Sequence, residues 1–284
     1  MSPKFVTSSR ILAVAAVTAS VALLATGCAT SSASTGGSSS SAVETVKVGA
    51  TFPADDILKY VESSGQAKKA GIDIQVTSFT DYTTPNTSLE DGSTDANLYQ
   101  HLPFLTNFNA TNGTHIVPVG KVYFPALALY SKKITSVDQI KDGDTISIPS
   151  DLPNELRSLN LLAKAGLITV KDGATGVITD IATNPKHLKF QELDAATLPR
   201  AIDENVAGIV NLTFALPAGL TGKQQIFEES VDGTKYTNLL ATTDGHVPDK
   251  KIQALYKVLT SAETQAWITK QYKGLVTPAS GPAE

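Results

Sequence analysis

Short runs of apolar and β-branched residues alternate with amphipathic segments along the chain from residue 45 onward. Thr45–Thr51 (TVKVGAT) predicts a first strand, and Asp55–Gly65 predicts a helix after it. Ile72–Phe79 (IDIQVTSF) has apolar residues at alternate positions and predicts a second strand. This order of elements indicates an α/β fold with mainly parallel sheets, in which ligands bind beyond the carboxyl ends of the strands.

The same alternation continues to the C-terminus. Leu89–Asp91 with Gly92 predicts the end of a helix and a turn. Further strands are predicted at His115–Val119, Ala126–Ser131, Thr145–Pro149, Lys189–Leu193, Gly208–Asn211 and Tyr236–Thr242. Further helices are predicted at Ser136–Ile140, Asn154–Ala165, Leu198–Asn205, Thr213–Leu220, Pro248–Leu259 and Ala262–Tyr272.

The first 28 residues have the pattern of an export signal. Lys4 and Arg10 form a short positive region, and Ile11–Ala25 is an apolar run shorter than the roughly 20 residues of a membrane-spanning helix. The run ends in small residues before Cys28, which resembles the bacterial lipobox, where cleavage precedes a cysteine that carries lipid. We therefore predict a signal peptide over residues 1–27 and a lipidated Cys28. An uncleaved anchor with an incidental thiol is the alternative.

Residues 28–42 are rich in serine and have little apolar surface to bury, so they predict a flexible tether. The lipid on Cys28 would then hold a folded body to the cell membrane on its extracytoplasmic face. The membrane is a predicted partner only through that lipid.

The composition excludes several common classes of protein. The chain has 284 residues, with 23 Lys+Arg against 27 Asp+Glu and a net charge of −4, so nucleic acid is not a predicted partner. Cys28 is the single cysteine, which excludes an internal disulfide, a CxxC pair and an iron–sulfur cluster. The four histidines lie far apart, and HExxH, GxxxxGK[ST], GxGxxG and GxSxG motifs are absent. We predict no cofactor and no metal.

Arginine is rare in this lysine-rich chain and occurs only at Arg10, Arg157 and Arg200. Its planar guanidinium can hold a carboxylate through two parallel hydrogen bonds. Arg157 lies in the first turn of a predicted helix, where free backbone N–H groups also favour anions. It is therefore a candidate for anion binding, and an ion pair with Glu155 or Asp151 is the structural alternative.

Other polar residues have both a structural and a functional interpretation. Arg200 lies beside Asp203 and Glu204, which favours a structural ion pair. Asn211 ends a predicted strand, where its amide can cap the next helix or bind a ligand.

The segment Asp95–Phe104 (DANLYQHLPF) gathers aromatic, histidine and amide side chains. Tyr99, His101 and Phe104 could form one wall of a pocket. The structural alternative is a core histidine among aromatic neighbours. His101 has no second ligand nearby in the sequence, so we do not predict that it binds a metal.

Many short segments occur in an order that is typical of one protein family. They are FTDYTTPN (79–86), DG (91–92), DAN (95–97), QHLPFL (100–105), LYSKKI (129–134), NELRSL (154–159), KAGLI (164–168), NPK (184–186), ELDAA (192–196), LPR (198–200) and NLTFA (211–215). Through them the chain from about Val46 to Pro278 resembles the NlpA-type methionine-binding lipoproteins, the substrate-binding proteins of bacterial methionine ABC importers.

The resemblance implies a two-lobed clamshell, periplasmic-binding-protein-like (type II), with the ligand cleft between two α/β lobes. Lobe 1 is expected to comprise residues 43–127 and 240–284, and lobe 2 residues 128–239. In the family, the arginine that matches Arg157 holds the amino-acid carboxylate. The asparagine that matches Asn211 bonds the polar backbone atoms of the ligand. The other implied ligand-binding residues are Asn154, which neighbours them, and Tyr82, Tyr99, His101 and Phe104, which surround the thioether.

The implied function is the capture of methionine outside the cytoplasm and its delivery to an ABC permease driven by an ATPase. L-methionine is the expected ligand, and D-methionine stays open as a second one. The protein is expected to act as a monomer and to catalyse no reaction.

The chain departs from the family pattern at its first loop, Phe52–Asp56, which is one residue shorter than usual. It also has Tyr99 where the family usually has phenylalanine and Phe104 where the family usually has tyrosine, so a hydroxyl has moved from one position to the other. Another small amino acid or a short methionine-containing peptide therefore stays open as the ligand. Two further classes are considered: a surface-anchored enzyme using Ser158 with His101, and a surface lipoprotein with a vestigial cleft that acts in adhesion.

Overall fold

The computed structural model describes residues 43–283, except residue 221 and residues 232–234. The predicted signal peptide, the predicted lipidation at Cys28 and the predicted tether lie outside the described residues. Within the described range, no helix combines the length and the apolar character needed to cross a membrane.

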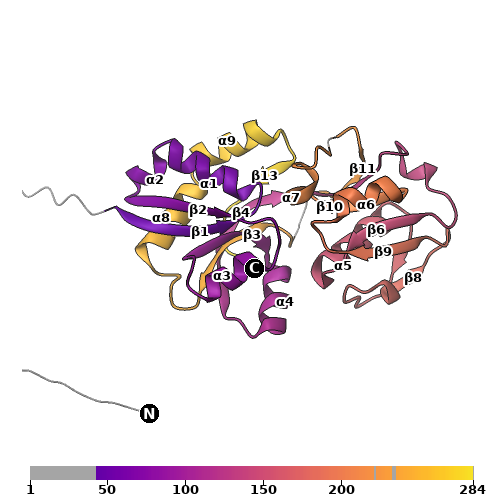
Figure 1. The fold of residues 1–284 in the computed structure, drawn as a ribbon, viewed down its shortest axis with the longest axis horizontal. Helices are drawn as coiled ribbons and strands as arrows, with labels where there is room; N and C mark the ends of the chain where they lie inside the picture. Colours follow the sequence, from indigo (N-terminus) through magenta and orange to yellow (C-terminus); the bar gives the residue numbers. More distant parts are fainter. Residues whose placement is uncertain (1–42, 221, 232–234, 284) are drawn as a thin grey trace, which may run out of the picture. The chain divides into compact units, whose positions relative to one another are not determined.

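Two mixed β-sheets organise the described chain, and each is the centre of one α/β lobe (Figure 1). In sheet order, lobe 1 has strands β13 (Val276–Pro278), β4 (Ile116–Pro125), β12 (Asn238–Thr243), β3 (Ala96–His101), β1 (Glu44–Ala50) and β2 (Ile72–Ser78). Lobe 2 has strands β11 (Gln225–Glu228), β5 (Leu127–Tyr130), β10 (Ala207–Asn211), β6 (Thr145–Pro149) and β9 (Lys189–Leu193). A separate pair joins β7 (Thr169–Val170) to β8 (Ile181–Thr183). The predicted two-lobed α/β fold is confirmed.

Helices flank both sheets. In lobe 1 they are α1 (Ala54–Ser63), α2 (Gln66–Lys69), α3 (Thr84–Glu90), α4 (Leu102–Asn112), α8 (Lys250–Leu259) and α9 (Ala262–Tyr272). In lobe 2 they are α5 (Leu152–Lys164), α6 (Leu198–Glu204) and α7 (Leu212–Ala215), with 3₁₀ turns at Val137–Gln139 and Ile178–Asp180.

Each lobe has its own apolar core, formed where amphipathic helices cover a sheet. In lobe 1, Ile57 and Leu58 of α1 are fully buried in one cluster with Leu255 of α8 and residues of the sheet. In lobe 2, Leu159 and Leu162 of α5 are fully buried in a second cluster. Burying a side chain of this size contributes about 1.5–3 kcal/mol, so each helix is held to its sheet mainly by its apolar face.

The chain passes between the lobes at two crossovers. At the first, β4 ends at Pro125 and β5 begins at Leu127, so only Ala126 separates a strand of lobe 1 from a strand of lobe 2. The second crossover leads from Glu228, at the end of β11, to Asn238, at the start of β12. Each crossover thus joins a strand of one lobe to a strand of the other.

The prediction of mainly parallel sheets is wrong, because both sheets are mixed. β1 pairs in parallel with β2 and β3, and β6 pairs in parallel with β9 and β10. The pairs of β12 with β3 and β4, and of β5 with β10 and β11, are antiparallel. The physical reason is the connectivity, since a chain that leaves one lobe and later returns can re-enter a sheet in either direction.

Two elements near the boundary between the lobes differ from the predicted ones. The helix predicted over Thr213–Leu220 is the short α7, Leu212–Ala215, which ends before Pro217 because proline has no N–H to continue the helical hydrogen bonds. The segment Asp95–Phe104, for which no element was predicted, contains β3 and the start of α4. Pro103 lies in the first turn of α4, a position that proline favours.

Candidate functional site

A cavity lies between the lobes, with lining residues from both of them. All seven residues predicted to bind the ligand lie in its wall: Tyr82, Tyr99, His101, Phe104, Asn154, Arg157 and Asn211. The wall is completed by Gln100, Pro125, Leu212, Thr213 and Asn238.

His101 ends β3 and is the residue that caps helix α4. Its Nδ1 accepts a hydrogen bond from the backbone N–H of Phe104 at 3.2 Å, so the proton of the neutral ring resides on Nε2. That Nε2 lies 3.3 Å from Oδ1 of Asn154 and donates to it. Burial, followed by the nearby positive charge of Arg157, lowers the pKa of His101 to about 3. The imidazole is therefore neutral at physiological pH.

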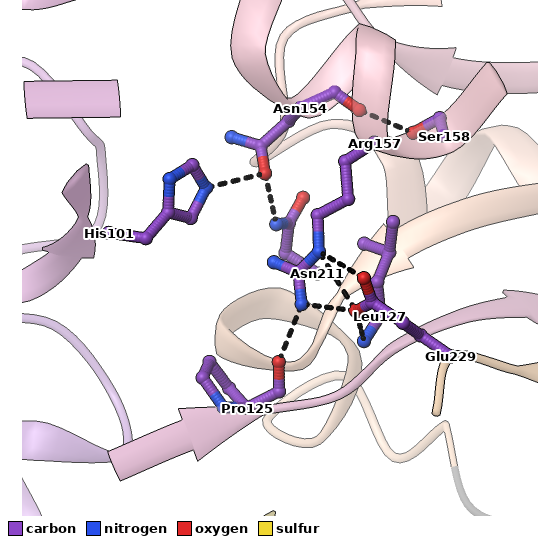
Figure 2. Close-up of polar contacts among 8 residues, drawn as sticks. All are labelled: His101, Pro125, Leu127, Asn154, Arg157, Ser158, Asn211 and Glu229. Atoms are coloured by element: carbon purple, nitrogen blue, oxygen red, sulfur yellow. Dashed lines mark hydrogen bonds and ion pairs between the residues drawn. The ribbon is translucent and has the colours of Figure 1, made fainter. Parts of the chain in front are cut away.

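The His101 hydrogen bond fixes the orientation of two asparagine amides (Figure 2). Oδ1 of Asn154 also accepts from Nδ2 of Asn211 at 3.0 Å, while Nδ2 of Asn154 donates to Oδ1 of Asp151 at 2.8 Å. Asn211 thus uses its donor within the protein, and its buried Oδ1 has no hydrogen-bond partner in the described structure. A buried acceptor without a partner is costly, which makes this oxygen a candidate for binding a donor from outside the protein.

Asn211 occupies the position before α7, but its side chain makes no capping hydrogen bond. The helix-capping alternative for Asn211 is therefore wrong. Its amide instead faces Asn154 and lines the cavity.

Arg157 is 2% exposed and forms a buried ion pair with Glu229 of the second crossover (Figure 2). Nε donates to the Glu229 carboxylate at 2.9 Å, and Nη2 donates both to Glu229 and, at 2.9 Å, to the carbonyl of Pro125. The guanidinium carbon also lies 4.6 Å from the ring centre of Tyr236, within cation–π distance. Nη1 has no hydrogen-bond acceptor among the described residues, so it is an unused donor.

The predicted ion pair of Arg157 with Glu155 or Asp151 is wrong, because the partner of Arg157 is Glu229. Glu229 was missed because it lies 72 residues away in the sequence and no local pattern links it to Arg157. No signal in the sequence pointed to Glu229, because the strand before it, β11, was not predicted either.

Aromatic side chains form the opposite part of the wall. The ring centre of Tyr82 lies 5.9 Å from that of Tyr99 and 5.7 Å from that of Phe104. The Tyr99 hydroxyl donates to the carbonyl of Tyr82 at 3.0 Å and so fixes the loop before α3. This is the hydroxyl at position 99 by which the chain departs from the family pattern. Desolvation raises the pKa of Tyr82. Tyr82 is therefore a neutral group in the wall of the cavity.

Asn238 is a lining residue that the sequence interpretation missed. Its Nδ2 donates to the carbonyl of Tyr99 at 2.7 Å and to the Tyr123 hydroxyl at 3.0 Å. Both hydrogen bonds use the amide nitrogen, so they fix this lining side chain against β3 and β4. Its position at the start of a strand gave no signal, because β12 was predicted to begin at Tyr236.

Arg200 and the altered first loop lie apart from this cavity. Phe52 and Arg200 line a neighbouring groove between the lobes, with Phe79 and Phe214. Asp203, a predicted partner of Arg200, pairs with Lys132 instead at 2.7 Å. The loop of Phe52 therefore contributes no side chain to the cavity described above.

The geometry does not support the enzymatic alternative. The Ser158 hydroxyl donates to the backbone carbonyl of Asn154 at 2.7 Å, and both ring nitrogens of His101 have other partners. A serine nucleophile needs a base within hydrogen-bond reach. Among the described residues, no group of three or more His, Cys, Asp and Glu side chains is arranged to hold a metal ion.

Comparison with known proteins identifies the family. The sequence profile of the NlpA lipoprotein family matches residues 46–280. The D-methionine-binding lipoprotein MetQ of Salmonella typhi is 37% identical over 234 residues, which are 81% of this chain and 86% of that protein.

Solved structures agree with the sequence match. A nutrient binding protein from Burkholderia cenocepacia, bound to methionine, has a TM-score of 0.79 and 35% identity, covering 82% of this chain and 99% of that one. An ABC transporter, periplasmic substrate-binding protein from Coxiella burnetii has a TM-score of 0.78 and 36% identity, covering 82% of this chain and 100% of that one. These relatives are substrate-binding proteins rather than enzymes. The chain belongs to the NlpA lipoprotein family.

Proposed function

We propose that this protein is an extracytoplasmic substrate-binding protein that captures methionine in the cavity between its lobes. One observation carries the proposal: the cavity presents a free guanidinium nitrogen of Arg157 together with the unpaired Oδ1 of Asn211. The first can donate to a carboxylate and the second can accept from an ammonium group. This pair of groups matches the zwitterionic end of an α-amino acid.

The aromatic wall matches the other end of methionine. Tyr82, Tyr99 and Phe104 surround the apolar part of the cavity, and their ring centres lie 5.7–6.0 Å apart. A thioether is polarizable and packs favourably at aromatic edges, with about 0.3–1.5 kcal/mol for each contact. The methionine bound in the Burkholderia cenocepacia relative supports the same ligand here.

The proposal includes a lipid anchor and delivery of the ligand to an ABC permease with its ATPase. The membership in a lipoprotein family and the Coxiella burnetii relative support these two points. A Cys28→Ala variant is expected to lose lipid labelling and to leave the membrane fraction. Continued lipid labelling of that variant would contradict the anchor.

Isothermal titration of the full chain in mild detergent tests the ligand. We expect saturable binding of L-methionine at one site, with D-methionine as the second compound to compare. Leucine, with a branched side chain and no sulfur, is the control and is expected to bind more weakly. Equal affinity for leucine and both methionine isomers would contradict methionine as the selected ligand.

A further inference from the structure

We propose that Glu229 is a positioning residue that orients Arg157 and cancels its charge, so that the cavity selects net-neutral amino acids over anions of the same shape. The proposal rests on the proposed function of the cavity. Glu229 does not line the cavity, so it acts on the ligand only through Arg157.

The contacts of Glu229 fix the guanidinium between the two crossovers. Glu229 belongs to the second crossover and also accepts from the backbone N–H of Leu127, beside the first crossover, at 3.3 Å. Arg157 in turn donates to the carbonyl of Pro125, at the end of β4. The ion pair therefore touches both connections between the lobes, and Nε and Nη2 have no freedom to turn toward a ligand. Figure 2 shows the side chains of this arrangement.

The burial of the pair makes its charge balance important. The side chains of Arg157 and Glu229 are 2% and 9% exposed. A buried charge without a partner is strongly unfavourable, and here each side chain neutralises the other before a ligand binds. The cavity thus meets its ligand with a guanidinium donor but without a net positive charge from this pair.

Lys235, an exposed residue whose ammonium lies 5.6 Å from the ring centre of Tyr236, is a further positive charge on this side of the molecule. The buried titratable side chains near Arg157 add none. His101 is neutral because burial lowers its pKa to about 3, and the raised pKa values of Tyr82 and Tyr99 keep both hydroxyls protonated. Asp151, which accepts from Asn154, is a further acidic group on this side of the cavity. A zwitterion leaves this balance unchanged, whereas a carboxylate without an ammonium group adds a negative charge that the neutral Arg157–Glu229 pair does not compensate.

The test compares L-methionine with 4-(methylthio)butanoate, which keeps the thioether and the carboxylate but lacks the ammonium group. Titration of the full chain at pH 7 gives the ratio of the two dissociation constants. We expect wild type to prefer methionine strongly. We expect Glu229→Gln to reduce this preference by roughly tenfold or more, because an uncompensated Arg157 charge favours the anion.

Two matched variants separate charge from structure. Glu228→Gln removes the neighbouring exposed carboxylate of β11 and is expected to keep the wild-type ratio. Glu229→Asp keeps the charge but shortens the side chain, so both ligands are expected to bind more weakly with the ratio preserved. If Glu229→Gln does not fold, the ratio in Glu229→Asp decides, and a collapsed ratio in that variant would overturn the proposal.

A Glu229→Gln variant that weakens both ligands by the same factor would show a structural role only and would overturn the proposal. Failure of wild type to bind methionine would instead refute the proposed function. In that case the affinity for 4-(methylthio)butanoate tests the proposal. Tighter binding of this anion by Glu229→Gln than by wild type, without the same change in Glu228→Gln, supports the charge role of Glu229. Absence of that gain overturns it.

Discussion

His101 of lobe 1 and Asn154 of lobe 2 join the two lobes through a hydrogen bond of 3.3 Å between Nε2 and Oδ1. The same Asn154 oxygen accepts from Asn211, whose own Oδ1 has no hydrogen-bond partner among the described residues. The contact between the lobes and the orientation of the Asn211 amide thus depend on one side chain, Asn154.

Replacement of Arg157 is expected to abolish tight binding. Arg157→Ala should weaken methionine binding by about 2–5 kcal/mol, because the ligand carboxylate would be desolvated without its partner. Arg157→Lys keeps the charge but loses the planar fork, so it should still weaken binding about tenfold or more. Calorimetric titration measures both effects, with Arg200→Lys as the control outside the cavity. Wild-type affinity in Arg157→Ala would refute the assigned role.

The same substitution should also destabilise the fold, because Glu229 would remain buried without its partner. Breaking a buried ion pair typically costs about 3–5 kcal/mol. Urea unfolding of Arg157→Ala should show this loss, and adding Glu229→Gln to it should recover part of the free energy of unfolding. A double variant no more stable than Arg157→Ala would contradict the interpretation.

Asn211 is expected to contribute through its carbonyl oxygen rather than as a helix cap. Asn211→Ala should weaken methionine binding by about 1.5–3 kcal/mol, the range for hydrogen bonds to charged groups. The control is Asn205→Ala, since Asn205 is a buried amide of the same lobe that bonds to Gln191. If Asn205→Ala weakens binding as much as Asn211→Ala does, the loss is not specific to the cavity.

From the low pKa of His101 we predict how the free energy of unfolding depends on pH. Its folded-state pKa of about 3 lies below the ordinary value of about 6.5, so between these values the unfolded chain binds a proton that the folded chain does not. The free energy of unfolding should therefore decrease as pH falls below about 6.5, by up to about 1.4 kcal/mol per pH unit from this residue.

His101→Asn keeps a side-chain acceptor for the N–H at the start of α4 but removes the titrating ring. Urea unfolding between pH 7 and pH 4.5 should give a shallower slope for this variant than for wild type. His115→Asn is the control, because His115 is 81% exposed in its side chain. Equal slopes for wild type and His101→Asn would contradict the assigned pKa.

Gly208 in β10 tests the packing of the lobe 2 sheet. A Cβ atom at this position would overlap Oγ of Ser147 and lie 2.7 Å from Cγ2 of Ile202. Gly208→Ala should therefore lower the free energy of unfolding by about 1–3 kcal/mol through overpacking. Gly222→Ala, whose Cβ would have no atom within 4 Å, should be nearly neutral. Thermal unfolding of the two variants checks the difference.

The fold was predictable where periodicity is local. The strand at Lys189–Leu193 and the helix at Ala262–Tyr272 were predicted with the bounds that the structure has, because each has a clear apolar pattern. The direction of strand pairing was not predictable in this way. The direction of pairing depends on the lobe from which the chain enters the sheet, and no short segment of the sequence determines this.

The candidate site was predictable in its residues but not in its connections. The resemblance to the family named His101, Asn154 and Asn211, and the structure brings them together in one hydrogen-bonded chain. It did not name Glu229 or Asn238, whose partners lie far away in the sequence. These contacts are made only in the tertiary structure, which brings residues far apart in the sequence together. The ligand-binding roles of the seven predicted residues stay predictions until binding is measured.

Native mass spectrometry of the full chain, purified from bacterial membranes in mild detergent, tests the central claim most directly. We predict a bound mass equal to that of methionine, which disappears on denaturation and is absent from Arg157→Ala. A protein that carries another compound, or one that is purified empty and then ignores added L- and D-methionine, would contradict the claim.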